Sequence, residues 1–230
     1  MRNEYNEFIK KHFPYSSCNE NESIELLYAR VCENNLVTEV YEKYILAEEC
    51  GINYHFIFLQ KYRNQLNKLL LYLPLNEPSG INFCMRATIE NLIKFLYSIY
   101  FRVDLQSVTR CKFRHIREGL SGVETESYID KVKMNILFNF YGNFSNSIHD
   151  KVEDQEFQLE YMESIIETCA FGLVELEAKV VTMLNIYESL ICNIFEIKEE
   201  TLSSSDILRL KKSLSSNRFK KVVNNLYKNE

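Results

Sequence analysis

The feature that most constrains this chain is its shortage of residues that end helices. Six glycines and three prolines occur in 230 residues, so few positions favour a turn. Between them, apolar residues recur every three or four positions, as at Ile24, Leu27 and Val31, the period of a helix with one buried face. Sustained alternation of period two, which would indicate strands, is absent, as is an internal repeat. We therefore expect an all-α fold, a bundle of long helices.

Turn and capping residues divide the chain into segments. Pro14, Gly51, Pro74 and the Ser121-Gly122 pair each close one. The expected helices span residues 3–13, 23–51, 52–73, 81–100, 104–120, 127–150 and 154–197, and a final basic helix follows the N-cap residues 203–206.

Two of these segments leave alternatives open. The Asn34-Asn35 pair would divide residues 23–51 into two pieces. As one helix of about 40 residues, the run 154–197 would measure about 60 Å, longer than a compact domain is wide. It must therefore curve, break near Gly172 or project.

We divide the chain into three parts. Residues 1–51 are an N-terminal helical segment that packs on the bundle, residues 52–198 form the bundle itself, and residues 199–230 form a basic C-terminal helix. The long C-terminal helix and the basic tail are expected to extend beyond the body.

Composition argues against several classes of protein. The seven cysteines are scattered and never form a C-x-x-C pattern, so neither disulfides nor a zinc site is expected.

The N-terminus carries acids and has no apolar core, unlike a signal peptide. The most apolar stretch, 168–195, contains Glu175, Glu177, Lys179 and Glu188, which a bilayer core would reject. We expect a cytoplasmic protein with no membrane partner, no metal and, lacking nucleotide-binding motifs, no cofactor.

Charge is distributed unevenly along the chain. The net charge of −5 argues against indiscriminate nucleic-acid binding by the body. The segment 206–230, however, has seven basic residues and two acids. It is either a solvated helix face or a docking site for RNA or an acidic partner. The candidate binding residues are Arg209, Lys211, Lys212, Arg218, Lys220 and Lys221.

A charged pair interrupts the apolar stripe of the helix 81–100. The stripe passes through Ile89, Ile93 and Leu96, and extending it backwards by three residues reaches Arg86. Glu90 follows Arg86 by four residues, a spacing at which a carboxylate and a guanidinium can pair. Because a charge on a buried stripe is costly unless paired, we expect an Arg86–Glu90 ion pair.

The helix 127–150 carries a similar interruption. Its stripe through Met134, Phe138 and Tyr141 continues to Ser145, and His149 lies one turn beyond. If this helix packs on the helix 81–100, the polar residues of the two helices meet in one cluster. The cluster is either a buried network that fixes packing or an acid–base site, with His149 transferring a proton and Arg86 stabilising negative charge.

These residues resemble motifs of the HEPN superfamily. The chain reads M-R-A-T-I-E-N-L-I-K-F-L-Y around Arg86 and Glu90, and Y-G-N-F-S-N-S-I-H-D around Ser145 and His149. The resemblance covers residues 52–198. It implies a four- or five-helix bundle from bacterial antiphage-defence or toxin–antitoxin systems, which usually dimerises. In active members it also implies a metal-independent endoribonuclease site at the dimer cleft.

The chain departs from the family pattern at one point. Active members carry Arg-x4-6-His on one helix, but no arginine occupies the corresponding positions before His149. Either Arg86 substitutes from the neighbouring helix or catalysis is lost. Arg110 and His115 fit the spacing literally, but their highly charged surroundings indicate a solvent-facing helix, so they are the second candidate.

Two functions follow as hypotheses. The first is an HEPN-like endoribonuclease or toxin that acts on RNA as a homodimer. The second is a non-catalytic helical interaction subunit of a defence or toxin–antitoxin assembly, bound to a protein encoded in the same operon.

Overall fold

Every regular element in the described part of the chain is a helix. The computed structural model describes residues 2–19, 21–47, 56–122, 130–149, 163 and 172–227, and no strand occurs in these ranges. The all-α architecture expected from the sequence is confirmed.

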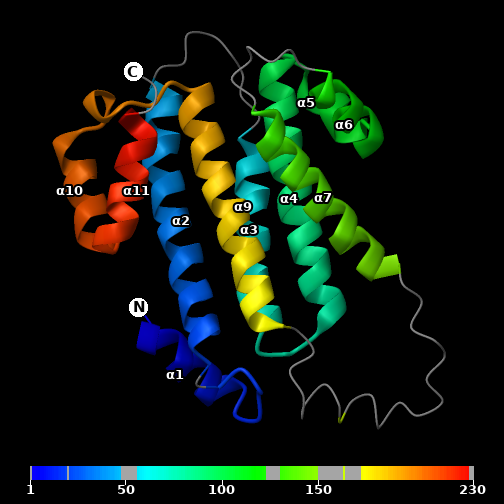
Figure 1. Ribbon diagram of the computed structural model, residues 1–230, viewed down its shortest axis with the longest axis vertical. Helices are drawn as coiled ribbons and strands as arrows, with labels where there is room; N and C mark the ends of the chain where they lie inside the picture. The colour runs from blue at the N-terminus through cyan, green and yellow to red at the C-terminus, as the bar shows by residue number, and fades with distance from the viewer. Residues whose placement is uncertain are drawn as a thin grey trace.

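In the described part of the chain, five long helices lie roughly side by side (Figure 1). They are α2 (Glu22–Ala47), α3 (Ile57–Tyr72), α4 (Pro78–Tyr100), α7 (Lys131–His149) and α9 (Leu173–Ile194). Helices α3 and α4 form an antiparallel pair, α7 packs on the other side of α4, and α9 packs against α2 and α7.

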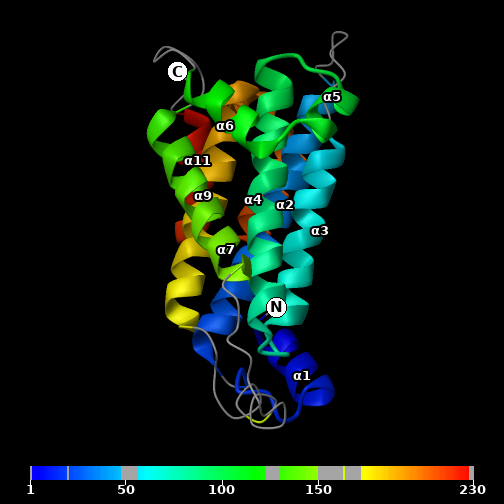
Figure 2. The same cartoon turned by 90° about the vertical axis from the view of Figure 1, so that its right-hand side faces the viewer.

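Shorter helices cover the ends and one side of this body. They are α1 (Arg2–His12), α5 (Leu105–Arg110), α6 (Phe113–Ser121), the 3-10 turn η1 (Glu199–Thr201), α10 (Ser204–Ser213) and α11 (Ser216–Tyr227). At one end α1 packs on α2, while α5 and α6 pack on α4 at the other end (Figure 2). Helices α10 and α11 contact each other, with α10 on α2 and α11 on α9.

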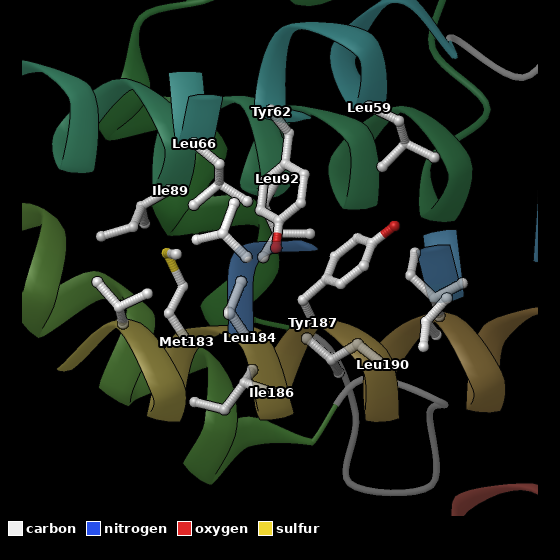
Figure 3. Close-up of a cluster of buried hydrophobic side chains, with 14 of the residues drawn as sticks. Leu59, Tyr62, Leu66, Ile89, Leu92, Met183, Leu184, Ile186, Tyr187 and Leu190 are labelled. Atoms are coloured by element: carbon white, nitrogen blue, oxygen red, sulfur yellow. The ribbon is translucent and has the colours of Figure 1, made fainter. Parts of the chain in front are cut away.

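The apolar core lies where α3 and α4 face α9. Leucine, isoleucine and tyrosine side chains from the three helices interdigitate there (Figure 3). At its centre the rings of Tyr62 and Tyr187 stack with their centroids 4.5 Å apart, and both side chains are fully buried. Offset aromatic stacking adds stabilisation beyond the buried area.

Local capping explains where the central helix α4 begins. The Glu77 carboxylate accepts hydrogen bonds from the backbone N–H groups of Ser79 and Gly80, and Pro78 occupies the first helical position. Both features favour a helix start. A Cβ atom at Gly80, in the first turn of α4, would overlap the Tyr72 ring at the end of α3, so glycine lets the two helix ends approach closely.

Several expected helix boundaries are wrong. The segment 104–120 is two helices, because α5 ends at Arg110, the next residue Cys111 is extended, and α6 begins after Lys112. The final basic helix is likewise two helices, because the chain is extended at Leu214. Helix α2 continues through Asn34 and Asn35 without a break.

The long C-terminal helix does not project. Among the alternatives for residues 154–197, the break near Gly172 is confirmed on its C-terminal side, because α9 begins directly after Gly172. Except for residue 163, the stretch 154–171 lies outside the described residues. Along α9, apolar side chains are buried from Leu176 to Cys192. The expectation that this helix and the basic tail extend beyond the body is therefore wrong: α9 is buried, α10 packs on α2 and α11 packs on α9.

A buried polar network joins four helices at the centre. Glu188 of α9 is fully buried and pairs with Arg218 of α11, which is 4% exposed. The Asn34 amide of α2 donates to Glu188 Oε1 at 2.9 Å. Tyr62 of α3 donates its hydroxyl to Asn34 Oδ1 at 3.1 Å. The hydrogen bonds made by the Asn34 side chain account for an asparagine inside a long buried helix.

We expect Glu188→Ala to lower the free energy of unfolding by about 3 kcal/mol, because the buried Arg218 loses its closer carboxylate partner and keeps only Glu33, at 3.7 Å. Urea denaturation followed by circular dichroism measures the change. Glu118→Ala, which removes an exposed carboxylate paired with Arg114 on α6, is the control and should change stability little. Equal effects of the two variants would contradict a structural role for the buried pair.

Candidate functional site

The two helices that carry the first candidate residues are neighbours, as expected from the sequence. Helix α4 packs along α7, and Arg86 reaches across to Tyr141. Arg86 Nε donates to the Tyr141 hydroxyl at 3.4 Å, and the guanidinium carbon lies 5.5 Å from the centre of the ring. Phe113 of α6 stacks on Tyr141, with ring centroids 3.6 Å apart. Arg86 thus contacts Tyr141, and Tyr141 in turn packs on Phe113.

The expected Arg86–Glu90 ion pair does not form. Glu90 pairs instead with Lys94, one turn further along α4, with 2.6 Å between Oε1 and Nζ. A glutamate that precedes a lysine by four residues is the better of the two helical orientations. Arg86 and Glu90 therefore have different partners, Tyr141 and Lys94.

Ser145 and His149 share one face of α7 with Tyr141, because each follows the last by four residues. Ser145 Oγ is buried and has no hydrogen-bond partner within the described ranges. His149 is the last residue of α7, and its side chain lies outside the described residues, as does Asp150. Its backbone lies about 12 Å along the helix axis from Tyr141, at 1.5 Å per residue. Arg86 is therefore held two turns away from the backbone of His149.

A small pocket of about 160 Å³ lies near the C-terminal end of α7. Polar groups line it from three helices: Asn82 of α4, Ser147 of α7, and Glu175 with Lys179 of α9. Lys179 Nζ lies 2.7 Å from Glu175 Oε1, and this hydrogen-bonded ion pair lowers the pKa of the glutamate.

The second candidate pair is divided between two helices. Arg110 ends α5, whereas His115 belongs to α6, and both side chains are exposed. His115 Nδ1 lies 3.6 Å from Glu118 Oε2, and Arg114 Nε donates to the other oxygen of the same carboxylate at 2.8 Å. The bond from Arg114 lowers the pKa of Glu118. The pair lies on the solvent-facing surface that the sequence indicates.

The candidate basic residues of α10 and α11 fall into two groups. Arg209 binds Glu39 of α2, with 2.9 Å between Nη2 and Oε2, and Arg218 is buried in the central network. For Arg218 this corrects the expectation of an exposed binding residue. Lys211, Lys212, Lys220 and Lys221 are exposed and pair with no acid in the described part of the chain.

Asp206 anchors α10 to the body. Its Oδ1 lies 2.8 Å from Lys43 Nζ, and its Oδ2 accepts from Ser203 Oγ at 2.8 Å and from the Tyr44 hydroxyl at 2.9 Å. Ser203 also caps the helix by accepting from the Asp206 N–H. The hydrogen bonds from Lys43 and then from Ser203 lower the pKa of Asp206 to about 2.

A larger pocket, which the sequence did not indicate, lies between α7, α9 and α11. It has a volume of about 540 Å³ and is lined by Lys133, Arg218 and Lys221, with asparagine side chains from α9 and α11. Lys133 and Arg218 are far apart in the chain and share no sequence motif. Their position in one pocket could therefore not be predicted from the sequence.

Comparison with known proteins returned no match to a protein-family model, a curated protein or a solved structure. Within the described residues, no cluster of three or more histidine, cysteine, aspartate or glutamate side chains is arranged to hold a metal ion. No helix there combines the length and apolarity needed to cross a bilayer.

We expect Asp206→Asn to lower the free energy of unfolding at pH 7 by about 1–2 kcal/mol, since it weakens charged hydrogen bonds. The folded-state pKa of Asp206, about 2, lies below the unfolded value of about 3.9. Its stabilisation is therefore present above pH 4 and is lost as the pH falls toward 2. Urea denaturation between pH 7 and pH 3 should show the difference from wild type shrinking.

The control for this experiment is Glu200→Gln, which removes one exposed carboxylate at η1. This variant should follow the wild-type pH profile. A constant difference between Asp206→Asn and wild type at every pH would contradict the assigned contribution of the carboxylate.

Proposed function

We propose that this protein is a non-catalytic helical interaction subunit that binds an acidic protein partner. The observation that carries the proposal is the C-terminal lysine surface, defined as Lys211, Lys212 and Lys220. These three side chains are exposed and make no ion pair with the described residues. The partner supplies the negative charge that they lack.

The way in which α10 and α11 are held supports this proposal. Arg209, Arg218 and Asp206 bind groups of α2 and α9, so both helices are fastened to the body. Lysines on such a rigid unit present a fixed pattern of charge. Charge complementarity of this kind raises association rates and selects partners.

The charge of the whole chain favours a protein partner over RNA. The net charge is −5 although residues 204–227 contain six basic residues and one acid, so the rest of the chain is strongly acidic. An acidic body would repel an extended phosphate backbone, whereas a compact acidic patch on a protein can contact the lysines alone.

The contacts of the candidate catalytic residues also favour binding over catalysis. Arg86 is held by Tyr141, Glu90 by Lys94, and His115 lies exposed beside Glu118. Because the motifs around Arg86 and His149 resemble those of the HEPN superfamily, we place this subunit in a defence or toxin–antitoxin assembly. Its partner would be encoded in the same operon.

Reversing the charge of the lysine surface tests the proposal. The triple variant Lys211→Glu, Lys212→Glu and Lys220→Glu should lose at least about tenfold in affinity for the protein that co-purifies with the wild type, because three attractive contacts become repulsive. The co-purified protein is identified by mass spectrometry, and its dissociation constant is measured at two salt concentrations.

The control carries the same charge change at Lys61, Lys68 and Lys112, which are exposed elsewhere. It should leave the affinity unchanged. An equal loss in both triple variants, or a partner that is not acidic, would overturn the proposal.

A second candidate function, a metal-independent endoribonuclease acting as a homodimer, has one observation in its favour. The polar pocket with Asn82, Ser147 and Lys179 lies near the end of α7 that carries His149. Lys179 is the cation of this pocket, and a phosphate group that bound it would have to displace its ion pair with Glu175.

Under this second candidate, His149→Ala should lower the rate of RNA cleavage by the purified protein by about 10²–10⁴-fold, the contribution of a general acid or base. His12→Ala, at an exposed histidine that ends α1, is the matched control and should retain the wild-type rate. Cleavage that survives His149→Ala, or no cleavage by the wild-type protein, would exclude this candidate.

A further inference from the structure

We propose that the groove between α7, α9 and α11 binds a short acidic segment of a protein partner, with a carboxylate held between Lys133 and Lys221. The inference rests on the proposed binding of an acidic partner and names a second, separate point of contact. Helix α9 lies between the other two helices in Figure 1 and forms the floor of the groove.

The charge of the groove favours an anion. None of the described residues that line it is acidic, and three of them are cationic: Lys133, Arg218 and Lys221. Two of the three already have acidic neighbours outside the lining. Lys133 Nζ lies 3.4 Å from Asp130 Oδ2, and Arg218 pairs with Glu188. Lys221 has no acid partner within the described residues, so its charge is available to a ligand.

A donor group in the groove is also available to a ligand. It does not come from Arg218 Nε, which is buried and lies 3.7 Å from Glu33 Oε2. The Asn185 carbonyl oxygen already accepts a hydrogen bond from Arg30 at 3.1 Å, so its amide N–H groups are the part of that side chain left for a ligand.

The shape of the groove suits a peptide. Its floor extends along α9 from Thr182 to Ser189, a span of about 10 Å at 1.5 Å per residue. Three residues of an extended chain cover the same length, at about 3.3 Å per residue. The volume of about 540 Å³ falls within the range of small-ligand sites, roughly 300–1,000 Å³.

The remaining lining groups match the other parts of a peptide. Asn224 and Asn225 of α11 carry amide groups that both donate and accept, as does the peptide backbone. Ile136 of α7 and Ile186 of α9 supply an apolar surface. We therefore expect the bound segment to combine an acidic residue with an apolar neighbour.

The test is fluorescence anisotropy with the full chain and two labelled pentapeptides of alternating leucine and acidic or amide residues. The glutamate peptide should bind, and its glutamine counterpart should bind about tenfold more weakly or not at all. The double variant Lys133→Gln with Lys221→Gln should weaken binding of the glutamate peptide about tenfold. The control, Lys61→Gln with Lys68→Gln, makes the same charge change at exposed lysines of α3, outside the groove and the lysine surface, and should bind as the wild type does.

Equal affinities for the two peptides, or equal losses in the two double variants, would overturn the assignment of the groove. Preferential binding of inorganic phosphate or a short single-stranded RNA, lost in the groove variant, would also overturn it and assign the groove to phosphate. These results are independent of the charge-reversal experiment at Lys211, Lys212 and Lys220. Failure of the groove and failure of the lysine surface are therefore distinguishable.

Discussion

The buried ion pair between Glu188 and Arg218 is the interaction on which the arrangement of the C-terminal half depends. A charge removed from water is costly unless a partner and hydrogen bonds compensate it. Glu188 therefore requires both Arg218 of α11 and Asn34 of α2 in place. The apolar core alone would tolerate rotation or sliding of neighbouring helices, since many apolar contacts are interchangeable. The network restricts α2, α9 and α11 to one register. It thereby also fixes the positions of α9 and α11, which line the groove.

The same constraint organises the surface charge. Arg209 and Arg218 bind carboxylates of the body, while the neighbouring lysines face solvent. Arginine suits the fixed positions because its planar guanidinium forms several directed hydrogen bonds. Lysine, with a compact charge on a flexible stem, suits contact with a partner that arrives from solution. Attachment and recognition are thus divided between two types of basic residue on the same pair of helices.

Much of the helix pattern could be predicted from the sequence because it depends on local signals. The packing of α4 on α7 followed from polar residues on otherwise apolar stripes. The partners of those polar residues did not follow: Arg86 binds Tyr141, which lies 55 residues away in the chain, and Glu90 binds Lys94. The burial of Arg218 was also missed, because its neighbours Lys220 and Lys221 are exposed and the segment has the composition of a surface helix. Only the position of Glu188 across the fold distinguishes Arg218 from them.

The packing of α2 against α9 has a consequence for synthesis of the chain. Asn34 and Glu188 are 154 residues apart, so the central network joins one of the first helices translated to one of the last. Contacts between such distant segments form late and slow folding. Until α9 and α11 have left the ribosome, the Asn34 amide and the apolar face of α2 that packs on α9 stay exposed to water. During that interval the growing chain exposes the surface by which partly folded proteins recruit chaperones or associate with one another.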